Sequence, residues 1–213
     1  MCVIIVKKQG VNVPSMAIMK QAYNANPHGC GFAVSKSNGK MYMFKSLNFK
    51  EFANKFYKNV STDDCCIIHF RLATHGSKCR ANCHPFTNGK GLYFAHNGVL
   101  PIQSVDNKTD SQILFDAVLA PAAEIYGLYS HTFSQIVDSV RETSKFAFLD
   151  KCGVQTFGNF ENVNGLLFSN LRGLYALQSP PSYLNDYRSY SFYNQLFSEH
   201  NKAYKTKKFD FSN

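Results

Sequence analysis

The chain has no tryptophan, few arginines and no long apolar run. Only five of its 213 residues are Arg, the residue that most often reads nucleic-acid bases and phosphates in a bidentate manner. The net charge of +9 comes mainly from lysines that are spaced singly, such as Lys36, Lys40 and Lys45. This pattern is typical of a solvated face, so we favour a solvated surface over a nucleic-acid site.

The absence of long apolar runs argues against export and against a membrane segment. The N-terminal apolar stretch covers only residues 2–6, and the positive charges Lys7 and Lys8 follow it rather than precede it. A signal peptide has the opposite order, and a membrane span needs about 20 apolar residues. The seven cysteines are an odd number and cannot all pair, so we expect reduced thiols and a cytoplasmic protein.

The composition that remains is that of a folded domain with an aromatic core. Apolar residues make up 45% of the chain and charged residues 17%, with 19 Phe and 12 Tyr. The length and the lack of a repeat or linker predict a single domain. We expect its core over about residues 2–178, followed by a C-terminal extension over about 179–213.

Hydrophobic periodicity predicts strands and helices grouped in blocks. Continuous or alternating apolar runs indicate strands, Asn38-Gly39 indicates a hairpin turn, and Thr109 indicates a helix N-cap. Grouped elements of this kind favour an α+β fold with mainly antiparallel sheets. The strands are expected at 2–6, 29–34, 41–45, 65–70, 92–96, 146–150, 154–157, 166–169 and 174–178. The helices are expected at 16–26, 49–57, 109–119, 133–141 and 192–204.

The segment 65–98 holds four of the seven cysteines and four of the seven histidines. One interpretation is a zinc site made by Cys79, Cys83 and His84 with His75 as a fourth ligand. A second close ligand pair is missing, however, and the adjacent positions of Cys83 and His84 make chelation by both awkward. We therefore favour a site without a metal and without a cofactor.

Cys2 supports a sharper hypothesis. If Met1 is removed, Cys2 carries both a thiol and a free α-amine, which titrates near pH 8 and can take up the thiol proton. One residue would then supply the nucleophile and its base. The alternative is a small apolar cysteine at the start of a strand.

Three further features fit acyl transfer. The Asn97 side-chain amide and the Gly98 N–H, at a strand end, can stabilise an oxyanion. Arg71 can bind a substrate carboxylate through its planar fork. Asp110 can accept a hydrogen bond from a substrate ammonium, although helix capping is its commoner use.

As an ordered set, these motifs resemble the glutaminase domain of class II glutamine amidotransferases, which are N-terminal-nucleophile hydrolases. The segment 26–33 is most similar to short, stand-alone members of that family. The resemblance runs in order from residue 2 to about residue 170. It rests on Cys2, Arg71-Leu72-Ala73-Thr74-His75-Gly76, His84-Pro85-Phe86, Phe94-Ala95-His96-Asn97-Gly98 and Thr109-Asp110-Ser111.

The resemblance implies an αββα sandwich and a role for each matching position. Cys2 would attack the γ-amide of glutamine, and Asn97 with Gly98 would form the oxyanion hole. Ammonia and then glutamate would be released. The resemblance also implies substrate-binding roles for Arg71 and Asp110, a pocket shaped by Thr74, His75 and Gly76, and a supporting role for His84.

The sequence leaves the substrate and the partner open. His28 and Cys30 stand where short members of the family usually carry Asp and Trp, and Val3 stands where many have Gly. A γ-glutamyl amide of a small metabolite is therefore an alternative substrate, and a non-catalytic basic or zinc-binding module is a third hypothesis. The residues after the sandwich are too few for a synthetase domain, so any ammonia acceptor would be held by a separate synthetase or acceptor-binding subunit.

Overall fold

The computed structural model describes residues 2–73, 77–105 and 108–177. One compact unit extends to Tyr175, and Ala176–Asn213 forms a separate unit. This division lies close to the predicted end of the core near residue 178, whereas the single-domain assignment stays a prediction. The predicted helix at 192–204 lies outside the described residues.

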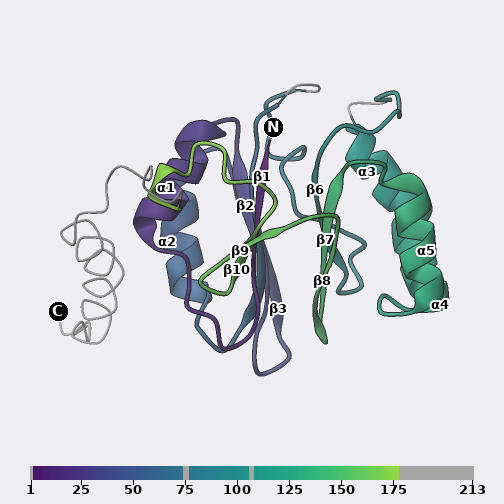
Figure 1. Ribbon diagram of the computed structural model, residues 1–213, viewed down its shortest axis with the longest axis horizontal. Helices are drawn as coiled ribbons and strands as arrows, with labels where there is room; N and C mark the ends of the chain where they lie inside the picture. Colours follow the sequence, from purple (N-terminus) through teal and green to yellow (C-terminus); the bar gives the residue numbers. More distant parts are fainter. Residues whose placement is uncertain (1, 74–76, 106–107, 178–213) are drawn as a thin grey trace, which may run out of the picture. The chain divides into compact units, whose positions relative to one another are not determined.

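The first unit contains a six-stranded antiparallel sheet, in which β1 lies next to the centre (Figure 1). Ile5 of β1 pairs with Ile68 on one side and with Phe168 on the other. β2 and β3 form the hairpin predicted at Asn38-Gly39, where Gly39 has a φ of 79°. In sheet order the strands are β3 (Met41–Ser46), β2 (Cys30–Ser35), β4 (Cys65–Phe70), β1 (Val3–Lys7), β10 (Leu166–Phe168) and β9 (Glu161–Val163).

A second, four-stranded antiparallel sheet packs against the first. Ala95 and Ala147 pair across its two central strands. In sheet order the strands are β5 (Phe86–Thr87), β6 (Tyr93–Asn97), β7 (Lys145–Asp150) and β8 (Gly153–Phe157).

Helices cover the outer face of each sheet, so the unit has four layers in the order α, β, β, α (Figure 1). α1 (Met16–Ala25) and α2 (Phe49–Asn59) cover the six-stranded sheet, and their N-caps are Ser15 and Asn48. The four-stranded sheet is covered by α3 (Asp110–Leu114), a π-helical turn (Phe115–Leu119), α4 (Ala120–Tyr126) and α5 (His131–Val140).

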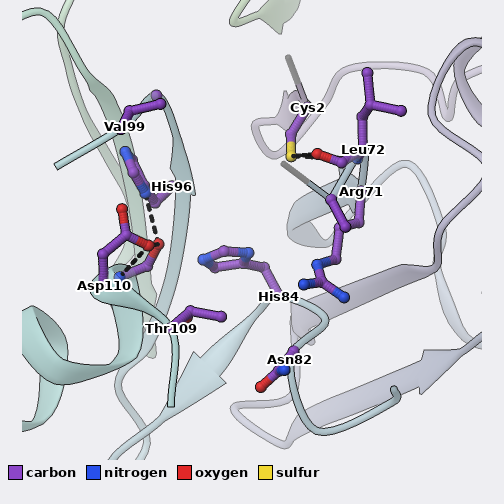
Figure 2. Close-up of a pocket in the computed structure, with 12 residues that line it drawn as sticks. Cys2, Arg71, Leu72, Asn82, His84, His96, Val99, Thr109 and Asp110 are labelled. Atoms are coloured by element: carbon purple, nitrogen blue, oxygen red, sulfur yellow. Dashed lines mark hydrogen bonds between the residues drawn. The ribbon is translucent and has the colours of Figure 1, made fainter. Parts of the chain in front are cut away.

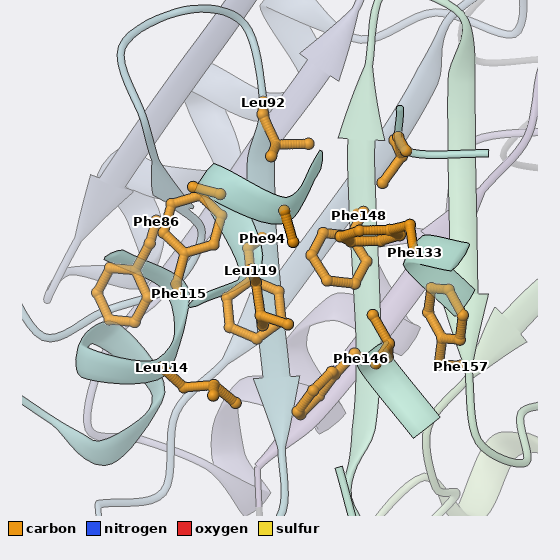
Figure 3. Packing of buried hydrophobic residues seen from close by; sticks show 14 of the residues in the cluster. Phe86, Leu92, Phe94, Leu114, Phe115, Leu119, Phe133, Phe146, Phe148 and Phe157 are labelled. Atoms are coloured by element: carbon orange, nitrogen blue, oxygen red, sulfur yellow. The ribbon is translucent and has the colours of Figure 1, made fainter. Parts of the chain in front are cut away.

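The aromatic residues form the core between the four-stranded sheet and its helices (Figure 3). Phe94 lies near the centre, with ring centroids 5.3 Å from Phe115 and 5.0 Å from Phe148. Burying such large rings supplies much of the hydrophobic free energy that holds a helix on a sheet.

The core between the two sheets is built from smaller side chains. Three alanines, Ala33 of β2, Ala95 of β6 and Ala147 of β7, are fully buried there. They pack in one cluster with Ile4, Val6, Ile67 and Leu149. Small side chains at these positions allow the two sheets to approach closely.

The prediction of an α+β fold with mainly antiparallel sheets is confirmed, and one predicted element is wrong. The expected strand at 174–178 is a 3-10 helix, Tyr175–Leu177, as far as the described residues extend. Leu174 and Leu177 are buried while Tyr175 is 75% exposed, so the apolar residues recur at a spacing of three. Among the described residues, no helix is both long and apolar enough to cross a bilayer.

Candidate active site

A pocket opens between the ends of the two sheets (Figure 2). Cys2 and Arg71 line it from the six-stranded sheet, and His96 and Asp110 line it from the four-stranded sheet and the start of α3. His84 lies between these two sides in Figure 2. The lining residues are Cys2, Arg71, Leu72, Ala73, Asn82, His84, His96, Gly98, Val99, Thr109, Asp110 and Ser111.

Cys2 immediately precedes β1, and contacts with two residues, Leu72 and Asn170, hold it there. Its Sγ accepts a hydrogen bond from the Leu72 backbone N at 3.3 Å and lies 3.6 Å from the Leu72 carbonyl oxygen. Its own carbonyl oxygen accepts a hydrogen bond from Asn170 Nδ2 at 2.8 Å. Burial raises the pKa of the Cys2 thiol, although the Leu72 backbone hydrogen bond opposes this effect. A thiol in this position needs a nearby base to act as a nucleophile at neutral pH.

Arg71 follows β4 directly and is held by its backbone and its side chain. Its backbone N donates to Gly29 O at 2.8 Å, and its carbonyl oxygen accepts from His28 N at 2.9 Å. Its Nη1 donates to Ser77 O at 2.8 Å. The residue is only 4% exposed and lines the pocket, so its guanidinium has a fixed orientation and is of the kind that can pair with a carboxylate.

Asp110 begins α3 after Thr109, whose side chain caps the helix by accepting from Gln112 N. Oδ2 of Asp110 accepts from Leu100 N at 3.0 Å, and Oδ1 accepts from Ser111 N at 2.7 Å. The carboxylate lies opposite Arg71 across the pocket (Figure 2). The pocket thus presents a cation on one side and an anion on the other, an arrangement that fits the carboxylate and ammonium of an amino acid.

Asn97 and Gly98 stand at the end of β6, and only Gly98 lines the pocket. The Asn97 amide donates from Nδ2 to Ser169 Oγ at 2.8 Å. Its Oδ1 is buried and has no hydrogen-bond partner within the described residues. Gly98 has a φ of 157°, and a β-carbon there would lie 2.2 Å from Ser144 Oγ, so glycine is required by space.

Three histidines from separate segments form a buried column, and two of them, His84 and His96, line the pocket. His84 of the 77–85 loop has its ring centroid 4.4 Å from that of His69 and 6.3 Å from that of His96. His96 contacts Ser111 Oγ at 2.7 Å and Ser144 Oγ at 3.0 Å. Neither ring nitrogen of His69 or His84 has a hydrogen-bond partner of good geometry within the described part of the chain.

Burial lowers the pKa of all three histidines, so the column is neutral at physiological pH. Burial and the neighbouring His96 hold the pKa of His69 at about 3, and burial holds that of His96 at about 4, although Asp110 opposes the shift. Burial and the other two rings also hold the pKa of His84 well below its ordinary value. His84 is therefore an uncharged ring at the pocket, and its two buried nitrogens carry one N–H donor and one lone pair.

The structure brings together five of the residues singled out from the sequence: Cys2, Arg71, His84, Gly98 and Asp110. Asn97 is adjacent to the pocket without lining it. Thr74, His75 and Gly76 lie outside the described residues, so their roles stay predictions. Within the described ranges, no group of three or more His, Cys, Asp or Glu side chains is arranged to hold a metal ion.

Sequence reasoning missed the residues that fix the predicted site residues in place. Asn170 holds the Cys2 carbonyl, Ser169 binds the Asn97 amide, and Ser77 binds Arg71. The only available signal was the polar Ser169-Asn170 pair at the end of an apolar strand. Its significance depends on the pairing of β10 with β1, which periodicity does not reveal.

Comparison with known proteins identifies the fold of the chain through similarity to solved structures. No protein-family model and no curated protein matches the chain. Among solved structures, it is similar to the glutamine phosphoribosylpyrophosphate amidotransferase of B. subtilis in complex with ADP and GMP. The TM-score is 0.57 at 14% identity over 82% of this chain. The chain shares the αββα sandwich fold of this structure.

A second structure, described as the allosteric regulatory enzyme of purine biosynthesis, gives the same TM-score, identity and coverage. The chain spans 43% of the length of each of these two neighbours. The similarity therefore confirms, at the level of fold, the resemblance to class II glutamine amidotransferases that the sequence motifs indicated. In this fold the pocket adjoins the beginning of β1, where Cys2 lies.

Proposed function

We propose that the protein hydrolyses the side-chain amide of glutamine and that Cys2 is its nucleophile. The observation that carries the proposal is the convergence of Cys2, Arg71, Gly98 and Asp110 on one pocket. These residues come from four separate segments of the chain. They combine a thiol, a carboxylate-binding cation, a backbone N–H and an ammonium-binding anion.

Substrate binding follows from the charges of the pocket. The α-carboxylate of glutamine pairs with Arg71, and its α-ammonium pairs with the Asp110 carboxylate. Both protein groups are already oriented by backbone hydrogen bonds, so little side-chain entropy is lost on binding. The side-chain amide of the substrate then extends toward Cys2.

Removal of Met1 would expose the α-amine of Cys2 as the general base. The amine takes the thiol proton, Sγ attacks the amide carbon, and the oxyanion is stabilised by the Gly98 N–H and the Asn97 amide, which exchanges its Ser169 partner for the oxyanion. The amine returns the proton to the leaving nitrogen, and ammonia departs. Water then hydrolyses the γ-glutamyl thioester, giving glutamate and the free thiol. The ammonia would pass to an acceptor on another chain.

A second candidate is a γ-glutamyl amide with a substituent on its nitrogen. Val99 lines the pocket and is 57% exposed, so it offers an apolar contact at the opening of the pocket. A substituent could pack there without burying a polar group. A panel of γ-glutamyl amides would be assayed beside glutamine. Faster hydrolysis of a substituted amide than of glutamine would favour this class of substrate.

The direct test measures ammonia released from glutamine by the wild type, by Cys2→Ala and by Cys152→Ala. Cys152 is exposed and lies away from the pocket residues, so its variant is the matched control. We expect activity in the wild type and the control and none in Cys2→Ala. Intact-mass measurement should show that Met1 is absent from active protein. Activity with Met1 retained would refute the amine-assisted mechanism.

A further inference from the structure

The loop that follows Arg71 carries two cysteines of contrasting character. The Cys79 thiol is partly exposed, whereas Cys83 is fully buried. Cys79 Sγ accepts a hydrogen bond from Ser77 Oγ at 3.4 Å, and this contact together with nearby backbone N–H groups lowers the pKa of Cys79. Burial raises the pKa of Cys83. The loop therefore holds an accessible thiol that ionises readily beside a shielded one.

The turn of the loop brings the Cys83 sulfur close to the Cys79 backbone. Cys83 N donates to Arg80 O at 3.2 Å, so the chain turns between them. As a result, Cys83 Sγ lies 3.5 Å from the Cys79 carbonyl oxygen. A carbonyl oxygen is about 2.4 Å from its own Cα, so Cys83 Sγ lies within about 6 Å of Cys79 Cα. Rotation of the two side chains within the loop is the movement that a disulfide requires.

We propose that Cys79 and Cys83 form a redox-sensitive pair whose oxidation to a disulfide weakens substrate binding by Arg71. The oxidant is a hydroperoxide. The Cys79 thiol is oxidised to a sulfenic acid while hydrogen peroxide is reduced to water. The Cys83 thiol then attacks that sulfur, an S–S bond forms, and the sulfenic oxygen leaves as a second water. Two thiols lose two electrons and two protons, and one peroxide yields two waters.

Two contacts connect the pair to Arg71. The Ser77 hydroxyl donates a hydrogen bond to the Cys79 sulfur. The Ser77 carbonyl oxygen accepts a hydrogen bond from the Arg71 guanidinium. The same carbonyl accepts from Asn82 Nδ2 at 3.3 Å, next to Cys83. Moving the Cys79 sulfur toward Cys83 breaks its hydrogen bond to Ser77 and shifts the segment that orients the guanidinium.

The second connection runs through Gly29. Cys83 Sγ fills the space beside this residue, since a β-carbon at position 29 would lie 2.3 Å from that sulfur. Gly29 O in turn accepts the Arg71 backbone N–H. Turning Cys83 Sγ toward Cys79 leaves a gap against Gly29, so the disulfide disturbs both the backbone and the side-chain supports of Arg71.

The formation of the pair can be tested without any assumption about activity. Reduced protein is treated with one equivalent of hydrogen peroxide and digested with trypsin without reductant. Trypsin cuts after Lys78 and Arg80, so the disulfide would join the dipeptide 79–80 to the peptide 81–90. We expect this linked species by mass spectrometry in wild type and in Cys152→Ser, and its absence in Cys79→Ser. Oxidation of Cys79 to sulfinic acid without the linked species would overturn the pairing.

The coupling to Arg71 rests on the proposed function and is tested by binding. Glutamine affinity is measured by calorimetry in the Cys2→Ala background, in which peroxide cannot oxidise the nucleophile. We expect oxidation to raise the Kd about tenfold, as for the loss of one charge-assisted hydrogen bond, with recovery in dithiothreitol. Cys2→Ala with Cys79→Ser should show no change. An unchanged Kd in cross-linked protein would overturn the coupling, whereas failure of reduced protein to bind glutamine would overturn the proposed function and leave the peptide result standing.

Discussion

Acid should destabilise this protein steeply because it carries three neutral, buried histidines. The perturbation is a fall in pH below about 6.5, the ordinary pKa of histidine. In the folded state the pKa of His96 is held at about 4 and that of His69 at about 3. The unfolded chain therefore takes up protons first as the pH falls. The stability that these neutral histidines contribute is fully present above about pH 6.5. It is lost progressively as the pH falls toward the folded-state pKa values of about 4 and about 3.

The size of the effect follows from the shifts. Each histidine that remains neutral in the folded state costs about 1.4 kcal/mol of unfolding free energy per pH unit below 6.5. At pH 5 this amounts to about 2 kcal/mol for one ring and about 4 kcal/mol for His69 and His96 together, and His84 adds to the loss in the same direction. The stability of a typical domain is about 5–15 kcal/mol, so the loss is a large part of the total.

Urea unfolding followed by circular dichroism between about pH 7 and pH 5 measures this slope. His69→Leu removes one titrating ring that has no hydrogen-bond partner of good geometry within the described residues, so its slope should be smaller by about 1.4 kcal/mol per pH unit. His131→Gln alters an exposed ring and should keep the wild-type slope. The reasoning is refuted if wild type is equally stable at pH 7 and pH 5, or if His69→Leu keeps the wild-type slope.

Three further substitutions test individual contacts. Arg71→Lys loses the planar fork and should raise the KM for glutamine about tenfold with a smaller change in kcat. Equal KM values in the variant and the wild type would show that Arg71 does not bind the substrate. Asn97→Ala should lower kcat about 10²- to 10³-fold in steady-state assays if the amide turns from Ser169 to the oxyanion, and unchanged kcat would contradict that role. Gly31→Ala would place a β-carbon 2.2 Å from His84 O, so urea unfolding should show a loss of about 2–4 kcal/mol in unfolding free energy. Gly39 has open space around it but a positive φ, so Gly39→Ala should lose less unfolding free energy than Gly31→Ala.

Local sequence signals predicted most of the elements correctly. The continuous apolar runs gave the central strands, and Thr109 caps α3 as expected. The helix was predicted to end at residue 119, but helical structure continues through α4 to Tyr126. The prediction ended too early because Pro121, which lacks an N–H, lies at the start of α4. A π-helical turn precedes it and changes the hydrogen-bond register, which periodicity alone does not indicate.

Individual residues of the candidate site could be proposed from the sequence where a short motif within one segment contains them. Arg71, Gly98 and Asp110 each stand at the boundary of an element, where motif and capping signals are strong. Contacts between distant segments could not be predicted in this way. Asn170 reaches the Cys2 carbonyl across 168 positions of sequence, and only the antiparallel pairing of β10 with β1 brings them together.

The alanines between the two sheets have a consequence for the pocket. One side of the pocket belongs to the six-stranded sheet and the other to the four-stranded sheet, and Ala33, Ala95 and Ala147 allow the close approach of these sheets. A larger side chain at Ala147 would have to be accommodated by sheet separation, because the interior is close-packed. The distance between the cation and the anion that would hold the substrate can thus be altered by residues that touch no substrate. Selectivity for a longer or shorter amino acid could evolve from inside the sandwich.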